Sequence, residues 1–280
     1  MEQRITILVN SCDKYEDAWH PFFECLWHFA GEIPYPIVLN TETKQFSSPH
    51  YDVQVVNTEK NCTWSERLLN VLEYVETEYV FFLLDDYFLK DRFDKERFES
   101  VIDYMRSHPD VGIVDVRPRW AESAEEEALN RERYKDIEDS FVERNEENFN
   151  ITCSPAIWRT DVLKSLLRPH EDVWSFEYYS GIRAKKYGIK VVRFFTRVPT
   201  IYEYDYQVWT GMGITAGQWL PKNKAFFDSL GIEVNYNRLG ILDASSLEEI
   251  RVHNRSSAKT MVKKAIQKAK KRLNRHKSLK

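Results

Sequence analysis

The stretch that decides the fold is Glu78-Tyr79-Val80-Phe81-Phe82-Leu83-Leu84-Asp85-Asp86-Tyr87. Six consecutive apolar or aromatic residues, 79–84, are too few for a helix of ordinary length and are typical of a strand buried on both faces. Two adjacent carboxylates come next, without a spacer. The stretch therefore predicts a central strand of a helix-covered sheet that ends directly in an acidic loop.

The segments on either side repeat this alternation of strand and helix. Strands are predicted at residues 4–9, 37–39, 53–56, 112–116, 150–158 and 190–195, and helices at 17–30, 67–75, 98–106, 160–167 and 177–187, with Ser65 as the N-cap of the second helix. Residues 121–147, which are rich in Glu and Arg, are interpreted as a solvated helical excursion or a mobile segment, not as a site. This order predicts an α/β fold with a Rossmann-like, mostly parallel sheet flanked by helices. Polar residues at the strand ends, such as Asp13, Thr41 and Asp85, should then converge on one cleft.

The pair Asp85-Asp86 is the strongest chemical signal in the sequence. Two carboxylates at a buried strand end are costly unless they bind a cation or strong hydrogen-bond donors. Divalent cations that also hold phosphate oxygens use such ligands. The alternative is an acidic pair that caps the next turn.

A resemblance to a known family rests on several stretches in the same order. They are 64–69 (Trp-Ser-Glu-Arg-Leu-Leu), 78–89, 154–159 (Ser-Pro-Ala-Ile-Trp-Arg) and 174–177 (Trp-Ser-Phe-Glu). Together they resemble bacterial GT-A-type glycosyltransferases of capsule and surface-polysaccharide biosynthesis, over roughly residues 4–220. The resemblance implies a GT-A-like fold and the transfer of a sugar from a nucleotide-sugar donor, and it does not identify the sugar or the acceptor.

The resemblance also implies roles for individual residues of the first half. Ser11, Asp13 and Thr41 would face the base or ribose, and Trp64, Ser65 and Arg67 would lie beside the nucleotide. Asp85 and Asp86 would bind the donor and a metal, Mn²⁺ or Mg²⁺, in the place of the family's Asp-x-Asp motif. Position 87 is Tyr rather than Asp, so the motif is incomplete, and Arg67 or Lys222 are alternative sources of positive charge.

In the second half the resemblance makes Glu177 the general base. A carboxylate beside the attacking hydroxyl can take its proton, and a single displacement of this kind inverts the anomeric centre. The alternative is that Glu177 is a first-turn residue favoured by the helix dipole. Glu171 and Asp172 are nearby rivals, and Trp174 and Asp172 are the predicted acceptor-side residues.

Charge is distributed unevenly along the 280 residues. From residue 250 onward there are 12 Lys or Arg and no Asp or Glu, whereas the preceding 249 residues hold 28 basic and 44 acidic groups. Residues 251–280 are predicted to form a basic amphipathic tail, whose part 256–280 contacts an anionic membrane. The domain 1–250 would combine a nucleotide-binding part at about 1–118 with an acceptor part at about 148–250. The tail has two other interpretations, a solvated tail and a nucleic-acid patch.

The remaining expectations concern location and partners. No signal peptide is visible at the N-terminus, and the four cysteines form no Cys-x-x-Cys pair, which favours a cytoplasmic protein, peripheral on the inner face of the plasma membrane. Its partners would be the nucleotide-sugar and a lipid-linked glycan acceptor, with no nucleic acid, because the acidic main body repels phosphate backbones. The alternative functions are a metal-dependent phosphohydrolase or nucleotidyltransferase and a non-enzymatic nucleic-acid-binding protein.

Overall fold

The fold is seen in a computed structural model, which describes residues 4–59, 61–116, 141–143, 151–194, 201–204 and 213–243. The chain divides into two compact units, one of residues 1–206 with 232–234 and one of residues 207–231 with 235–280. The first unit contains β1 (Ile5–Asn10), α1 (Glu16–Ala30), β2 (Ile37–Thr41), β3 (Val53–Asn57), α2 (Trp64–Leu72), β4 (Tyr79–Leu84), α3 (Lys95–Ser107), β5 (Val111–Asp115), β6 (Phe141–Glu143), β7 (Ala156–Arg159), α5 (Thr160–Leu166), α6 (Val173–Lys186) and β8 (Lys190–Phe194).

These strands form one eight-stranded sheet in the order β3-β2-β1-β4-β7-β5-β8-β6. Strands β1 to β4 are parallel to one another, and β5 is parallel to β8. Strand β7 lies antiparallel between β4 and β5, and β6 lies antiparallel at the edge beside β8. The predicted mostly parallel α/β sheet is therefore confirmed, with two reversed strands that the sequence pattern did not indicate.

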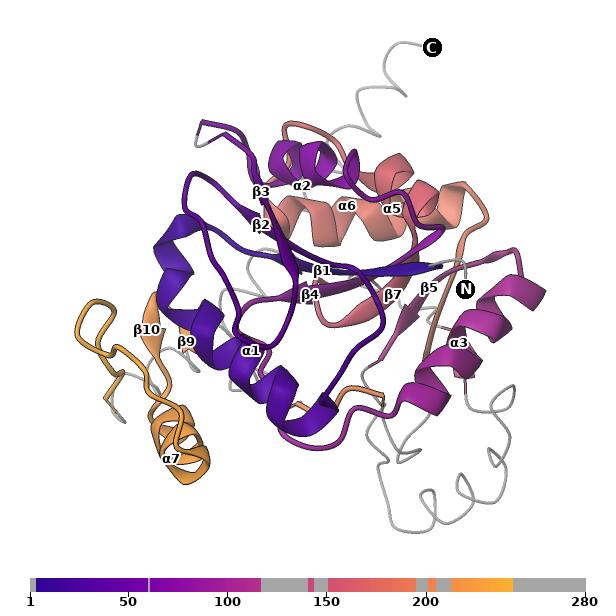
Figure 1. The fold of residues 1–280 in the computed structure, drawn as a ribbon. Coiled ribbons are helices and arrows are strands. Elements are labelled where there is room, and N and C mark those ends of the chain that lie inside the picture. The colour runs from indigo at the N-terminus through magenta and orange to yellow at the C-terminus, as the bar shows by residue number, and fades with distance from the viewer. Residues whose placement is uncertain are drawn as a thin grey trace. The chain divides into compact units, whose positions relative to one another are not determined.

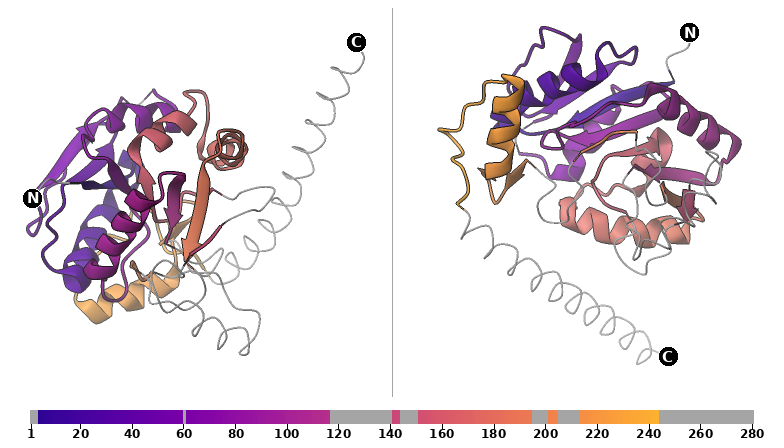
Figure 2. Two further views of the ribbon diagram at one scale, coloured as in Figure 1. Left: turned by 90° about the vertical axis from the view of Figure 1, so that its right-hand side faces the viewer. Right: turned by 90° about the horizontal axis from the view of Figure 1, so that it is seen from below.

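Helices cover both faces of this sheet (Figure 1). α1 and α3 lie on one face, and α2, α5 and α6 lie on the other. Both views in Figure 2 show α1 (indigo) and α6 (salmon) on opposite sides of the sheet. Because its two faces are both covered, every residue of β1 is buried and the strand is apolar apart from Thr6 and Asn10.

Several element boundaries differ from the predictions. For example, the predicted helix 98–106 is α3 (Lys95–Ser107), and the predicted helix 67–75 ends at Leu72. The contacts of the structure explain three of the differences. α2 begins at Trp64, since Thr63 and not Ser65 is its N-cap, in a capping box with Glu66. α6 begins at Val173, four residues earlier than predicted, because the Asp172 carboxylate accepts a hydrogen bond from the Ser175 backbone. The predicted strand 150–158 contracts to β7, which pairs with β4 along all four residues and with β5 along the first three.

The interpretation of residues 121–147 as a helical excursion is wrong at 141–143, which form β6. The rest of that segment, like the predicted tail 251–280, lies outside the described residues. In the described part of the chain, no helix has the length and apolar character needed to cross a bilayer.

The described residues of the second unit form a small hairpin and one helix. β9 (Ile214–Thr215) pairs antiparallel with β10 (Gln218–Trp219), and α7 (Pro221–Leu230) comes next. The fully buried Trp219 packs edge-on against Phe227 and Tyr236, at ring-centroid distances of 5.9 and 5.7 Å. This unit thus has a small aromatic core of its own.

Candidate functional site at the carboxyl ends of the parallel strands

The strand order reverses between β1 and β4, and this point carries the main polar cluster. The chain runs from β1 outward to β2 and β3 and then returns to place β4 on the other side of β1. Ligands of open α/β sheets bind at the carboxyl ends of the strands at such a switch point. Ser11 directly follows β1 and Asp85 directly follows β4, and the Ser11 hydroxyl donates a hydrogen bond to Asp85 Oδ2.

The Ser11–Asp85 contact is buried and is supported from α1. Ser11 is 6% and Asp85 is 5% exposed. The indole Nε1 of Trp19 donates to Ser11 Oγ over 2.6 Å. A side chain one helical turn into α1 thereby fixes the hydroxyl that holds the carboxylate.

The Asp85 carboxyl is electrostatically unfavourable in its charged form. Burial and the adjacent Asp86 raise its pKa well above the ordinary value, and the hydrogen bonds from Ser11 and Trp19 oppose this only in part. Asp86 is itself only 9% exposed. Such a pair gains most from a ligand that brings positive charge.

A divalent cation fits Asp85 and Asp86 if a ligand and water complete its coordination shell. Among the described residues, no group of three or more His, Cys, Asp and Glu side chains is arranged to bind a metal ion. Mg²⁺ commonly binds to one or two carboxylates, with substrate phosphates and water completing its shell. Asp85 and Asp86 thus suit a cation that arrives together with a diphosphate, rather than a closed protein site.

The two loops after β1 and β2 are joined by Asp13. Its carboxylate accepts hydrogen bonds from the backbone N–H groups of Glu42, Thr43 and Lys44, over 3.0 to 3.2 Å, and from the Thr43 hydroxyl. Burial by itself would raise the pKa of Asp13, but these donors outweigh it and hold the pKa at about 2. The observed contacts of Asp13 are therefore within the protein, and its predicted contact with a nucleotide stays a prediction.

Replacing Asp13 should destabilise the protein in a pH-dependent way. Asn cannot accept all of these hydrogen bonds, so Asp13→Asn should lose about 1–2 kcal/mol of unfolding free energy at neutral pH. Because folding lowers the pKa, the contribution is complete above the unfolded value of 3.8 and disappears as the pH falls through about 2. Urea unfolding at several pH values measures it, and Asp52→Asn, at an exposed position before β3, is the control. An equal loss from both variants would contradict this role.

Thr41 lies at the end of β2 and is fully buried. Its hydroxyl donates to the Lys44 carbonyl over 2.9 Å and accepts from the Asn57 amide over 2.7 Å. These bonds fix the loop after β2 against the end of β3. The predicted contact between Thr41 and a nucleotide remains a prediction.

Arg67 connects α2 to the same end of the sheet. It is 8% exposed, and its Nη1 lies 3.4 Å from both Glu42 Oε1 and the Ser11 carbonyl oxygen. A guanidinium is thus held beside the loops that follow β1 and β2. Its charge is shared with Glu42, so a ligand phosphate would have to compete with this carboxylate.

The other two predicted residues of α2 differ in their surroundings. Trp64 is half-buried and packs against Phe176, with ring centroids 5.3 Å apart, and against Phe82, at 6.5 Å. Ser65 is completely buried, and its hydroxyl has no hydrogen-bond partner among the described residues. Trp64 therefore connects β4 to α6, while Ser65 lies within the packed interior.

Glu177 approaches the same end of the sheet from α6. It is half-buried, and its Oε1 accepts a hydrogen bond from the Cys153 backbone N–H over 2.7 Å. β7 is antiparallel to β4, with Ala156 opposite Phe82. The residues just before β7, including Cys153, consequently run beside the residues just after β4. The hydrogen bond from Cys153 thus holds the Glu177 carboxylate at the end of the sheet at which Asp85 lies.

Glu171 and Asp172, the alternatives to Glu177 as general base, make other contacts within the protein. Glu171, which is 3% exposed, makes a bidentate ion pair with Arg183 over 2.6 and 2.7 Å. Asp172 caps α6 through the Ser175 backbone N–H, at 2.7 Å. Trp174, in the first turn of α6, is 57% exposed, so its ring is accessible, as an acceptor-side residue requires.

Two contributors to this cluster were not predicted. Trp19 lies within the predicted helix 17–30, one turn beyond the β1 loop, and no contact with the site was predicted for it. Glu42 bonds both to Arg67 and to the Asp13 backbone N–H. It directly follows Thr41 at a strand end, and that position is the signal that would have identified it.

The similarity of this chain to known proteins is low. No protein-family model matches this sequence, and no curated protein is significantly similar to it. Among solved structures, the chain is similar to the 1–349 fragment of S. aureus TarS in complex with UDP, with 14% identity, a TM-score of 0.47, and coverage of 70% of this chain and 59% of that one.

Two further structures are similar to the same degree. The mannosyltransferase PcManGT from Pyrobaculum calidifontis, in complex with GDP-Man and Mn²⁺, has 12% identity and a TM-score of 0.45, over 70% of this chain and 57% of that one. A cytidylyltransferase from Leptospira borgpetersenii has 10% identity and a TM-score of 0.45, over 91% and 96%. By its own strand order and pairing, the first unit is an α/β fold with a mostly parallel, Rossmann-like sheet. The chain spans less than two thirds of the TarS and PcManGT chains, and a likeness this distant does not select a reaction.

Proposed function

We propose that this protein is an inverting glycosyltransferase that moves a sugar from a nucleotide-sugar donor to a lipid-linked glycan acceptor during cell-surface polysaccharide synthesis. The observation that carries the proposal is the buried contact between Ser11 and Asp85 at the strand switch point. The hydrogen bond from the Cys153 backbone N–H to Glu177 supports it, because it adds a carboxylate from α6 at the same end of the sheet.

The chemistry assigns different tasks to these carboxylates. Glu177 takes the proton of an acceptor hydroxyl, whose oxygen bonds to the anomeric carbon as the bond to the donor's diphosphate breaks on the opposite face. Asp85 and Asp86 would hold a divalent cation, which would neutralise the negative charge on the departing diphosphate. Arg67 adds a fixed positive charge beside the loop after β1.

The residues directly after the acidic pair favour sugar transfer over phosphate hydrolysis. Hydrolases that use a strand-end Asp generally have an Asp-x-Asp pattern with Thr or Ser downstream, whereas this chain has Tyr87-Phe88-Leu89 at that place. Tyr87 packs edge-on against Tyr204, with ring centroids 5.0 Å apart, and Phe88 and Leu89 are buried. These three side chains thus serve packing.

Binding of a nucleotide should raise the melting temperature. At a ligand concentration 100 times the Kd, the stabilisation is about 2.7 kcal/mol, which corresponds to a shift of several degrees in a domain of this size. The measurement is a thermal-shift screen of UDP-, GDP-, CMP- and dTDP-sugars, each with and without Mn²⁺ or Mg²⁺. CTP is included in the same screen. A response to CTP alone would indicate a nucleotidyltransferase, and no response to any nucleotide would remove the transferase proposal.

The tail is part of the proposal because the acceptor is taken to be membrane-bound. Each basic side chain near an anionic leaflet contributes about 1 kcal/mol, so residues 256–280 would hold the enzyme at the cytoplasmic face of the plasma membrane. Deleting 256–280 should reduce co-sedimentation with anionic vesicles while the melting temperature is kept. Unchanged sedimentation would refute the tether.

A further inference from the structure

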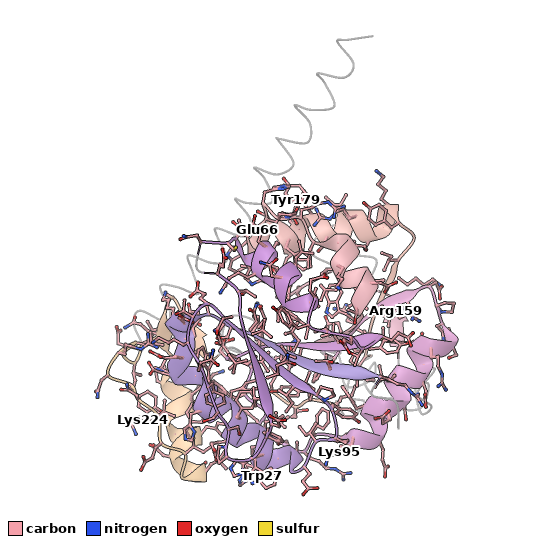
Figure 3. All side chains as sticks on the ribbon, turned by 45° about the horizontal axis from the view of Figure 1, so that its top comes forward. Trp27, Glu66, Lys95, Arg159, Tyr179 and Lys224 are labelled. Carbon is pink, nitrogen blue, oxygen red and sulfur yellow. The ribbon has the colours of Figure 1, made fainter. Side chains whose placement is uncertain are left out.

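The face of α6 that points away from the sheet is unusually apolar. Phe176, Ser180 and Ala184, at intervals of four residues, are buried against the rest of the unit. On the opposite side Trp174 is 57%, Ile182 48% and Tyr179 36% exposed. Tyr179 is labelled in Figure 3 on the outer side of this helix. A surface helix normally presents polar groups to water, so an apolar outer face indicates a contact partner.

The aromatic groups on this face are contiguous. Trp174, Tyr178 and Ile182 recur every fourth position and therefore share one line along the helix. Tyr178, which is half-buried, packs edge-on against Tyr179, with ring centroids 5.0 Å apart. We call these four residues, with Lys185 and Lys186 at the end of the helix, the outer α6 face.

The charge on the outer α6 face is positive. Lys185 and Lys186 are exposed at its C-terminal end. The one acidic residue of α6, Glu177, turns instead toward the Cys153 backbone. The charge of Arg183 is paired with Glu171. A face of Trp, Tyr and Ile with flanking Lys has the composition that lies in the headgroup region of an anionic membrane.

Charge also favours an anionic membrane over two other partners for the outer α6 face, namely the chain's own tail and a second copy of the chain. The chain's own residues 251–280 carry basic groups and no Asp or Glu, so they repel Lys185 and Lys186. A two-fold contact between copies would bring the same lysines into one interface. An anionic bilayer complements the face and the tail together.

We propose that the outer α6 face docks on the headgroup region of an anionic lipid bilayer, in addition to any contact made by the tail. The proposal goes beyond glycosyl transfer and does not require it. If the transfer proposal also holds, docking brings Glu177, on the same helix, to the membrane surface at which a lipid-linked acceptor would lie.

The test is co-sedimentation of the full chain with phosphatidylcholine vesicles that contain or lack phosphatidylglycerol, at low and high NaCl. High salt screens the basic tail, whereas apolar contact with the headgroup region persists. Trp174→Ser combined with Ile182→Ser should lower partitioning into anionic vesicles roughly ten-fold or more, at both salt concentrations. The matched control is Tyr74→Ser, because Tyr74 is 57% exposed but lies just after α2, and it should bind as the wild type does.

Two results would overturn the proposal. One is equal partitioning of the double variant and the wild type. The other is a change of oligomeric state in light scattering with vesicle binding unaltered, which would make the face a contact between copies. Thermal melting checks the fold of each variant. The nucleotide thermal-shift screen contains no lipid, so failure of docking and failure of the transfer proposal are distinguishable.

Discussion

Glu177→Gln is expected to lower the kcat of sugar transfer by about 10²- to 10⁴-fold, the usual contribution of a general base. Gln has the same shape, and its oxygen can still accept the Cys153 backbone N–H, so the segment before β7 should keep its place. The ability to take a proton is lost together with the negative charge. The measurement is release of nucleoside diphosphate from the donor that gives the largest melting shift, with a lipid-linked glycan as acceptor.

The comparison variant for Glu177 is Asp172→Asn. Asn caps a helix about as well as Asp, so α6 should be retained, and we expect at most a change in the KM of the acceptor. The nucleotide-induced melting shift of Glu177→Gln should equal that of the wild type. A larger loss of kcat in Asp172→Asn than in Glu177→Gln would transfer the role of base to Asp172.

Asp85→Asn is expected to stabilise the unliganded protein and to abolish the nucleotide-induced melting shift. Asn removes a buried charge beside Asp86 and keeps an oxygen that can accept from Ser11. Gains of this kind commonly amount to about 0.5–2 kcal/mol, and loss of function is their usual cost. Thermal unfolding with and without nucleotide and Mn²⁺ measures both effects. Destabilisation at neutral pH would show that the carboxylate is favourable where it lies.

The stability gain of Asp85→Asn should depend on pH. Burial and Asp86 raise the pKa of Asp85 in the folded chain, so the wild type loses stability as the pH rises from about 3.9 toward the raised pKa. The advantage of Asn should grow over the same range. Asp110→Asn is a control of opposite sign, since the hydrogen bond from Lys190 lowers the pKa of Asp110, and this variant should be slightly less stable at neutral pH.

The sequence predicted those elements whose burial is expressed in local pattern. β4 has the predicted bounds, because six apolar residues in a row are buried on both faces and a pair of carboxylates ends them. α1 begins within one residue of its prediction. The convergence of strand-end residues was also predictable from the sequence, since the carboxyl ends of parallel strands share one edge. Ser11 and Asp85 accordingly meet although 74 positions separate them.

Side-chain partners and strand direction were decided by the tertiary structure alone. No local pattern shows that Asp13 uses its carboxylate on the backbone of residues 42–44, or that Trp19 supports Ser11. β7 runs antiparallel between β4 and β5, yet a buried strand has the same apolar composition in either direction. Hydrophobic periodicity records how deeply a residue is buried, while its contacts depend on segments that are distant in the chain, and only the folded structure brings those together.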